Sequence, residues 1–219
     1  MLFVSKKVTY APLLDFLREK NIVLNGQSMI EFEPVDFNCP DPSSYDIIFF
    51  SSQRAASFYL ENCSIPSSVQ IATIGATTSS FLRKRGINVD FEGEKSGDPQ
   101  KVASEFASFI GNKKVLFPQS DRSQRSMQRQ LDSDQVIDLI VYSTLLRPIK
   151  LAGKCQTLVF TSPSNVEAFL RKNQISIDQK VVAWGNTTKA SLEKEQIKVD
   201  HTLEKSSFEE LTNFLRSIY

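Results

Sequence analysis

Hydroxyl side chains gather in four short segments of the chain, and the four segments form two matched pairs. With Ile47 placed over Thr157, a shift of about 110 residues, Ser51-Ser52 falls on Thr161-Ser162 and Gly75–Thr78 falls on Gly185–Thr188. Each segment follows a short apolar run and precedes a helical pattern. Helix N-termini present unpaired N–H groups and a partial positive charge, so these segments predict binding of carboxylates or phosphates. The alternative is that Ser and Thr only cap helices here.

Four cations and one tyrosine could act beside the hydroxyl segments. The cations, each next to a predicted strand end or loop, are Lys6, Arg54, Arg122 and Lys180. Tyr142 lies on a predicted strand, and its phenol can donate a hydrogen bond at neutral pH. A tyrosine packed in the core is the alternative for Tyr142, and a solvated helix face is the alternative for the arginines around Arg122.

Several established kinds of catalytic site are absent from the sequence. His201 is the single histidine and lies on a predicted strand, which indicates a structural role and argues against hydrolase triads. Neither GxxxxGK[ST] nor GxGxxG occurs, so nucleotide phosphates lack their usual loops. The three cysteines, Cys39, Cys63 and Cys155, have no metal-like spacing. We expect no metal and no cofactor, and we expect the cysteines to be buried or incidental thiols in a reducing cytosol.

A long internal repeat sets the architecture that must position these groups. Between Ile47–Ser96 and Thr157–Ser206, about fifteen of about fifty paired residues are identical without a gap. A period this long indicates duplication of a domain rather than a solenoid. Within each copy, short apolar runs alternate with helical patterns, which is typical of parallel α/β units.

The pattern predicts ten strands and eight helices. The strands are Leu2–Ser5, Ser28–Val35, Asp46–Phe50, Gln70–Ile74, Asn88–Phe91, Lys114–Phe117, Val136–Leu145, Thr157–Phe160, Lys180–Trp184 and Lys198–His201. The helices begin near Pro12 or cover Arg54–Asn62, Thr77–Arg85, the residues around Val102–Ile110, Gln124–Leu131, Asn165–Lys172, Thr187–Glu195 and Phe208–Ile218. The predicted fold is α/β, with two similar flavodoxin-like lobes, each a five-stranded parallel sheet flanked by helices.

One lobe is discontinuous in this prediction. Residues 1–36 and 150–219 form it, and residues 38–147 form the continuous lobe, with connectors near 34–42 and 146–150. The two chain crossings restrict motion to hinge bending. Two similar lobes imply a cleft in which equivalent loops face one ligand.

Composition limits the partners of the protein. Hydrophobic residues make up 41% of the 219 residues and charged residues 23%, which is ordinary for a globular protein. A net charge of +1 gives no overall field for nucleic acid or membranes. The first residues read neither as a signal peptide nor as a membrane span, so we expect a cytoplasmic protein. Nothing in the sequence suggests an oligomer.

A series of motifs, in order and spacing, resembles the uroporphyrinogen-III synthases. The resemblance covers nearly the whole chain and includes FFSSQRAASFYL, IATIGATTSSFLRKRGINVD, KVLFPQSDRSQ, IVYSTL, VFTSPSNVEAFL and VVAWGNTTKASL. It implies a cofactor-free lyase that closes the linear tetrapyrrole hydroxymethylbilane with loss of water. The last ring, D, is inverted through a spirocyclic intermediate.

The resemblance also implies roles for individual residues. The cleft tyrosine of the family falls on Tyr142, where it assists departure of the substrate hydroxyl. Hydroxyl loops of the family fall on Ser51, Ser52, Thr78, Ser162, Thr187 and Thr188, and its basic contacts fall on Arg54 and Lys180. Lys6 stands where the family commonly has arginine. With the neighbouring hydroxyls, the expected substrate-binding set is Lys6, Ser51, Ser52, Arg54, Thr77, Thr78, Ser162, Ser164, Lys180, Thr187 and Thr188.

Two other functions share part of this pattern. A two-lobed, non-catalytic module that closes on a small anion would have the same duplicated lobes. It would normally carry a signal peptide or a fused DNA-binding segment, and neither is evident. A flavodoxin-like protein-interaction domain would need an exposed apolar patch.

Overall fold

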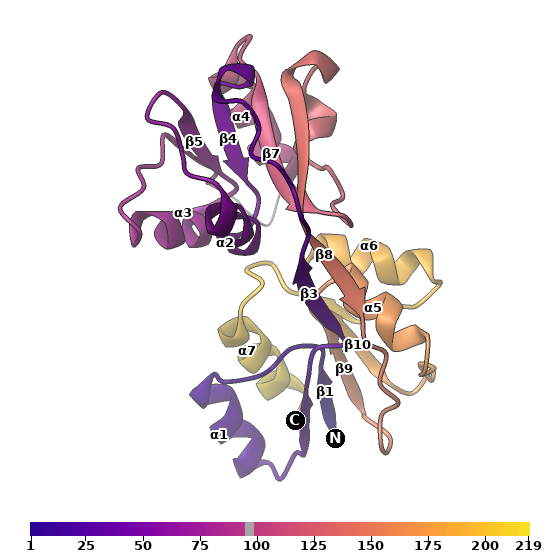
Figure 1. Ribbon diagram of the computed structural model, residues 1–219. Coiled ribbons are helices and arrows are strands. Elements are labelled where there is room, and N and C mark those ends of the chain that lie inside the picture. The colour runs from indigo at the N-terminus through magenta and orange to yellow at the C-terminus, as the bar shows by residue number, and fades with distance from the viewer. Residues whose placement is uncertain (95–98) are drawn as a thin grey trace. The chain divides into compact units, whose positions relative to one another are not determined.

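The chain divides into two compact units in a computed structural model that describes residues 1–94 and 99–219. Unit 1 consists of Met1–Glu31 and Leu145–Tyr219, and unit 2 consists of Phe32–Thr144. Figure 1 shows the elements of both units along the chain. In the described part of the chain, no helix is long and apolar enough to cross a membrane.

Unit 1 contains a five-stranded sheet in which every pairing is parallel. Its strands, in spatial order, are β11 (His201–Thr202), β10 (Lys180–Ala183), β9 (Thr157–Phe160), β1 (Leu2–Val4) and β2 (Leu24–Gly26). Its helices are α1 (Ala11–Glu19), α5 (Pro163–Leu170), α6 (Asn186–Lys194) and α7 (Phe208–Ile218).

Alternation of buried side chains places two helices on each face of this sheet. Phe3, Leu158 and Phe160 pack with α5 and α6, whereas Leu2, Val4 and Val159 pack with α1 and α7. Successive residues of a strand point to opposite faces, so a fully apolar strand such as Leu2–Val4 needs both faces covered. This explains why the strands read as continuous apolar runs in the sequence.

Unit 2 repeats the same design with one additional strand. Its strands, in spatial order, are β3 (Ile30–Pro34), β8 (Val136–Leu146), β7 (Val115–Ser120), β4 (Ile47–Phe50), β5 (Gln70–Thr73) and β6 (Phe91–Glu92). Its helices are α2 (Gln53–Asn62), α3 (Ala76–Arg83) and α4 (Pro99–Ile110), with 3-10 turns η1 (Pro42–Ser44), η2 (Gln128–Gln130) and η3 (Ser133–Gln135). Core residues of α2 and α3 pack on one face, and those of α4 pack on the other.

The strand orders of the two units are the same once the chain is permuted. The order β2-β1-β9-β10-β11 in unit 1 corresponds to β8-β7-β4-β5-β6 in unit 2, and the pairs β4/β9, β5/β10 and β6/β11 have the offset of the sequence repeat. The five shared strands of unit 2 are paired in parallel, with a register shift between Gln119 and Ser120 of β7. The predicted pair of flavodoxin-like parallel sheets is therefore confirmed.

Strands β3 and β8 form an antiparallel ribbon through which the boundary between the units runs. The Val35 N–H donates to the Val141 carbonyl at 3.3 Å, and the Arg147 N–H donates to the Met29 carbonyl at 2.7 Å. The predicted strand Ser28–Val35 overlaps β3 alone, and β2 lies outside its range. The second strand of the unit 1 sheet is β2, earlier in the chain, and β3 belongs to the ribbon. The short run Leu24–Gly26 lacks an apolar pattern strong enough to reveal a strand.

The predicted helix Gln124–Leu131 is wrong. Only the 3-10 turn η2 forms there, and Arg125 has a φ of 52°. The Arg125 N–H donates to Ser123 Oγ at 3.2 Å, and the Arg122 N–H donates to Ser120 Oγ at 3.1 Å. Such local hydrogen bonds compete with those of a helix.

The prediction for the cysteines is also wrong for two of the three. Cys39 and Cys63 form a disulfide that ties the segment entering unit 2 to the end of α2, while Cys155 is a buried free thiol. In unit 1 the corresponding positions are Ile149 and Asn173. There the Asn173 side chain donates to the Ile149 carbonyl at 2.8 Å and accepts from the Leu151 N–H at 2.9 Å. One unit makes this connection covalently, and the other makes it with hydrogen bonds.

Candidate active site

The seryl segments after β4 and β9 act as helix caps. Ser52 Oγ accepts a hydrogen bond from the Ala55 N–H at 3.1 Å, and Ser162 Oγ accepts one from the Asn165 N–H at 3.3 Å. The capping interpretation therefore holds for both of these serines, although each hydroxyl hydrogen stays free to be donated. Ser51 is exposed and lies directly at the carboxyl end of β4.

The segments after β5 and β10 behave differently. Gly75 and Gly185 precede α3 and α6 in extended conformation, and no side chain of the described residues caps either helix. The first N–H groups of a helix have no acceptor within it, so these two N-termini offer donors and a partial positive charge. Thr77 and Thr187 are exposed at these ends, whereas Thr78 and Thr188 are buried. The arrangement suits a carboxylate ligand on each helix.

Tyr142 lies in an aromatic cluster of unit 2 together with Arg54. The Tyr142 ring stacks on Phe58 with 5.2 Å between centroids and meets Phe32 edge-on at 5.8 Å. The Arg54 guanidinium carbon lies 3.4 Å above the centre of the Phe32 ring. Phe32 on β3 therefore connects the two predicted site residues, which are far apart in the sequence.

The hydroxyl of Tyr142 is accessible although its ring is packed. The residue is 8% exposed, and no hydrogen bond joins its hydroxyl to another described residue. Among the described residues, no buried side-chain nitrogen or oxygen lacks a hydrogen-bond partner. The Tyr142 oxygen must then reach solvent, so it is free to bond a ligand.

Lys6 follows β1 in unit 1. Its Nζ is 5.8 Å from the ring centre of Trp184 and 5.6 Å from that of Phe208. The two rings meet edge-on at 5.0 Å. Cation–π attraction of this kind holds an ammonium group in place while leaving it exposed to a ligand.

Lys180 and Ser164 lie at opposite edges of the unit 1 sheet. Lys180 is the first residue of β10, so it lies at the amino end of the strand, opposite the end that leads to Thr187. In open parallel sheets, ligands bind beyond the carboxyl ends of strands. Ser164 lies within the first turn of α5 and is partly exposed.

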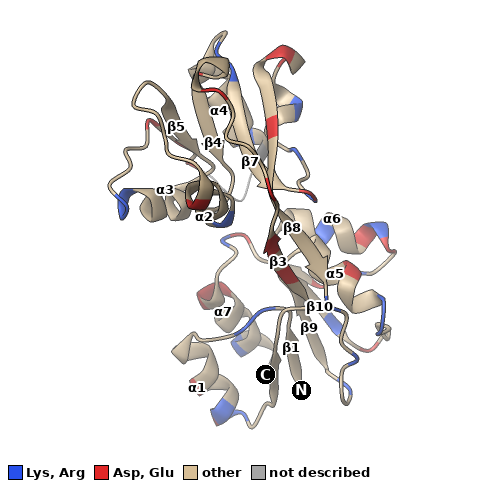
Figure 2. Cartoon of the chain, in the orientation of Figure 1, with Lys and Arg blue, Asp and Glu red and all other residues tan. Residues whose placement is uncertain are grey.

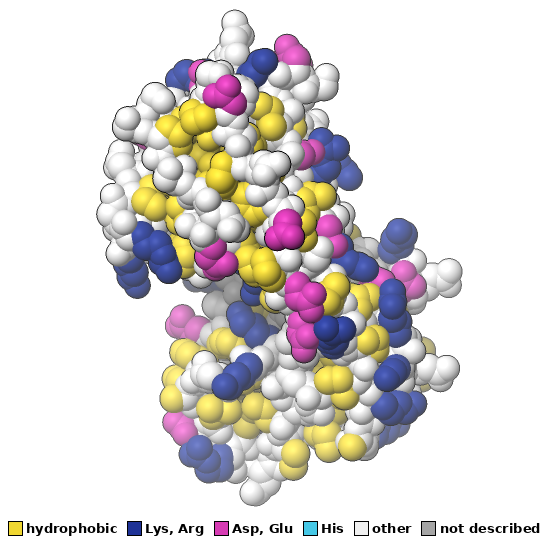
Figure 3. Space-filling view, in the orientation of Figure 1, with side chains coloured by type: hydrophobic (Ala, Val, Ile, Leu, Met, Phe, Trp, Pro, Cys, Tyr) yellow, Lys and Arg dark blue, Asp and Glu magenta, His cyan; other side chains and the backbone are white. Residues whose placement is uncertain are grey.

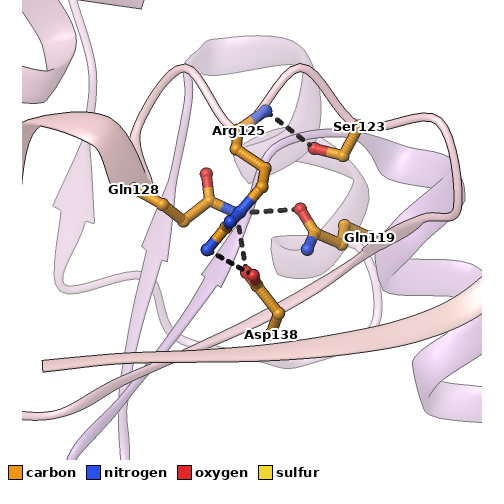
Figure 4. Close-up of polar contacts among 5 residues, drawn as sticks. All are labelled: Gln119, Ser123, Arg125, Gln128 and Asp138. Carbon is orange, nitrogen blue, oxygen red and sulfur yellow. Dashed lines mark hydrogen bonds and ion pairs between the residues drawn. The ribbon is translucent and has the colours of Figure 1, made fainter. Parts of the chain in front are cut away.

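A polar network missed by the sequence analysis shapes the loop after β7. Gln128 Nε2 donates to Gln119 Oε1 at 2.8 Å and to Asp138 Oδ1 at 3.1 Å, and Arg125 pairs with Asp138 at 2.7 Å (Figure 4). Beside it lies a cavity of about 160 Å³ lined by Ser51, Ile74, Phe117, Pro118, Gln119, Ser123, Gln124, Arg125, Ser126, Met127 and Gln128. The network fixes the loop at the carboxyl edge of the unit 2 sheet. Because Gln128 falls in a predicted helix, the sequence did not indicate that its side chain would fix this loop.

Asp121 supports the same loop, and the ionisation of its carboxyl group makes this support depend on pH. Its Oδ1 accepts from the Thr144 N–H at 3.0 Å and from Ser120 Oγ at 2.9 Å. Burial raises the pKa of Asp121, but these hydrogen bonds outweigh it and lower the pKa below its usual range.

We expect Asp121→Asn to lower the free energy of unfolding near neutral pH by about 1 kcal/mol, because a neutral acceptor replaces a charged one, which weakens the hydrogen bonds, and solvent screens part of the effect. Since the folded pKa is depressed, the contribution is complete above the unfolded pKa of about 3.9 and is lost as pH falls through the folded value. Urea unfolding of both proteins between pH 7 and pH 3 measures the difference. A gap that persists at the lowest pH would contradict this account.

The described residues contain no cluster suited to a metal ion. No group of three or more His, Cys, Asp or Glu side chains comes together among them. His201 stacks on Phe214 with 4.0 Å between ring centres, which is a packing role.

Comparison with known proteins identifies the family of the chain. A family model described as uroporphyrinogen-III synthase HemD matches residues 22–213. The chain belongs to the uroporphyrinogen-III synthase family. A uroporphyrinogen-III synthase from Chlorobaculum parvum (strain DSM 263 / NCIMB 8327) is 26% identical, and the match covers 91% of each chain.

Solved structures of uroporphyrinogen-III synthases share the fold. The protein from Helicobacter pylori 26695 has a TM-score of 0.73 at 18% identity, covering 100% of this chain and 99% of that one. A mutant of the protein from Thermus thermophilus has a TM-score of 0.64 at 13% identity, covering 99% and 98%. At these identities the likeness concerns the fold alone.

Proposed function

We propose that the protein is a uroporphyrinogen-III synthase, a lyase of tetrapyrrole biosynthesis. It would convert hydroxymethylbilane to uroporphyrinogen III by eliminating water, closing the macrocycle and inverting ring D. The observation that carries this proposal is the family match over residues 22–213.

The chemistry of the exposed groups supports this substrate class. Every pyrrole of hydroxymethylbilane carries carboxylate side chains, and the uncapped N-termini of α3 and α6 offer N–H groups for them. Thr77 and Thr187 lie at these ends, Lys6 contacts Trp184 next to Gly185 in unit 1, and Arg54 lies on the Phe32 ring in unit 2. A few placed cations suit such a ligand better than a strongly basic surface. Lys180 is not part of this proposal.

Positioning is the main task we assign to the protein. Hydroxymethylbilane loses its hydroxyl readily and then closes without inversion, so the enzyme must hold the chain so that the substituted carbon of ring D attacks first. Tyr142 would donate a hydrogen bond to the departing hydroxyl, which its accessible oxygen permits. Elimination of water and carbon–carbon bond formation involve no net oxidation, so no cofactor is needed.

The oligomeric state and the compartment are further parts of the proposal. We propose a monomer that works in the cytoplasm. Disulfides are uncommon there, so the state of Cys39 and Cys63 bears directly on the compartment. Alkylation of free thiols at lysis, followed by mass spectrometry, measures that state in cells.

The test of the activity is the identity of the product isomer. The protein is incubated with freshly prepared hydroxymethylbilane, and the products are oxidised and separated by chromatography. We expect type III isomer from the native protein and type I from heat-denatured protein. Type I alone from the native protein would reject the proposal.

Ligand binding should also change the fluorescence of Trp184. This single tryptophan precedes the Gly185–Thr188 segment and contacts Lys6, so a carboxylate bound there alters its surroundings. We expect saturable quenching on anaerobic addition of uroporphyrinogen III. Trp184→Phe is the control for absorption by the ligand. An unchanged signal at saturating ligand would remove this segment from the site.

A further inference from the structure

We propose a second anion-binding site in unit 1, at the amino edge of its sheet and thus opposite the candidate active site. Its predicted ligand is a small molecule with two or more carboxylate or phosphate groups. The site is a cavity of about 570 Å³, a size common for small-molecule sites. The loop before β9 and the segment after α5 form its walls.

The charge of the lining points to an anion. Four cations line the cavity, namely Lys150, Lys154, Arg171 and Lys172, and no carboxylate is among the lining residues. Figure 2 shows basic segments at the end of α5 and in the nearby loops, and Figure 3 shows their side chains gathered on that face. Lys154 pairs with Asp178, and Arg171 pairs with Glu167. Within the described chain, the side chains of Lys150 and Lys172 have no hydrogen bond or ion pair, so two positive charges stay uncompensated.

The walls are fixed by two neutral amides. The buried Asn173 side chain joins the Ile149–Leu151 segment to the end of α5 and also donates to the Phe169 carbonyl at 3.0 Å. The Gln179 side chain donates to the Cys155 carbonyl at 2.6 Å and accepts from the Ser176 N–H at 2.7 Å. The cavity is therefore preformed, which reduces the entropy lost when a ligand binds.

The corresponding positions of unit 2 show whether the fold itself requires these positive charges. Basic residues at a helix C-terminus often only complement the helix dipole. At the repeat offset, however, the four cations correspond to Pro40, Ser44, Glu61 and Asn62. Helix α2 extends two residues further than α5 at this offset and closes with Glu61 and Asn62, whereas Arg171 and Lys172 follow the end of α5. The fold does not require this charge, so the cavity in unit 1 has acquired it separately.

The test uses inorganic pyrophosphate and citrate as probes of the two anion types. Binding to the full chain is measured by calorimetry at low salt, and the site is located from amide shifts of Leu151 and Asn173 in two-dimensional NMR. The variant Lys150→Gln/Lys172→Gln removes the two unpaired charges without breaking a side-chain hydrogen bond or ion pair of the described chain. The control Lys84→Gln/Lys194→Gln removes the same charge from the ends of α3 and α6.

We expect saturable binding to the native protein and a loss of about tenfold or more in affinity in the Lys150/Lys172 variant, which corresponds to about 1.4 kcal/mol. The control variant should bind as the native protein does. Binding of pyrophosphate alone would identify a phosphate ligand, and binding of citrate alone or of both would identify a site open to carboxylates. Absence of saturable binding, or an equal loss in the control, would overturn the proposal. The product-isomer assay is independent of either result.

Discussion

Replacing Tyr142 by Phe should lower the turnover number for type III isomer by about 10²-fold, the lower part of the range for a well-placed general acid. The substitution removes only the hydroxyl, and that group makes no hydrogen bond to another described residue. The ring stays packed on Phe58 and Phe32, so stability and product affinity should change little. Initial rates with hydroxymethylbilane, together with fluorescence titration by uroporphyrinogen III, separate the two effects.

A matched control is Tyr45→Phe, which removes a buried hydroxyl elsewhere in unit 2. The Tyr45 hydroxyl lies 3.4 Å from that of Tyr59, so this variant loses a weak internal contact but none of the candidate site. We expect its turnover number to equal that of the native protein. If Tyr142→Phe turns over as fast as Tyr45→Phe, the phenol has no part in the mechanism.

Removal of the disulfide should have the largest effect on stability. The bond between Cys39 and Cys63 closes a loop with a sequence separation of 24 residues. In the chain-entropy model, a loop of this size corresponds to about 3.5 kcal/mol of unfolding free energy. Urea unfolding of Cys39→Ala/Cys63→Ala, compared with native protein with and without a reducing agent, measures the loss.

The reductant provides the internal control for this experiment. Native protein should fall to the stability of the double variant when reduced, and the variant should not respond, because Cys155 is buried and forms no disulfide. A double variant within about 0.5 kcal/mol of the oxidised native protein would show that the bond adds little beyond the packing around it.

Much of the fold follows from patterns in the sequence because both sheets are buried on two sides. Strands such as Ile47–Phe50 and Thr157–Phe160 are almost entirely apolar, and every residue of them is buried. The repeat then indicated that two similar units exist, and the order of their elements indicated which one is interrupted. The partial pattern of Leu24–Gly26, in contrast, reflects a strand of three half-buried residues.

The elements that sequence reasoning missed depend on interactions between distant residues. Nothing in the residues around Gln128 shows that its side chain meets Gln119 and Asp138, yet those bonds replace the predicted helix by a loop. The pairing of Cys39 with Cys63 depends likewise on how α2 packs against the preceding segment. The spacing of the cysteines in the sequence does not indicate this pairing.

The candidate site was predictable in residue type and only partly in placement. Helix N-termini follow strands in both units, so the segments at Thr77 and Thr187 lie where expected. Lys180 begins its strand in the predicted range and in the structure alike, so it lies at the amino end, whereas ligands of open parallel sheets bind at the carboxyl end. The connection from Arg54 through Phe32 to Tyr142 needed coordinates, since three separate segments supply it.

The interrupted order of unit 1 has a consequence for how the chain acquires its structure during synthesis. Leu2 pairs with Thr157, so about 150 residues must be made before β1 meets the central strand of its sheet, and such distant pairings are slow to form. Unit 2 lies wholly within this interval and can complete first. The chain enters unit 2 through β3 and leaves it through β8, and these two strands are hydrogen-bonded to each other. A folded unit 2 therefore brings the two parts of unit 1 close together, which shortens the effective loop that must close.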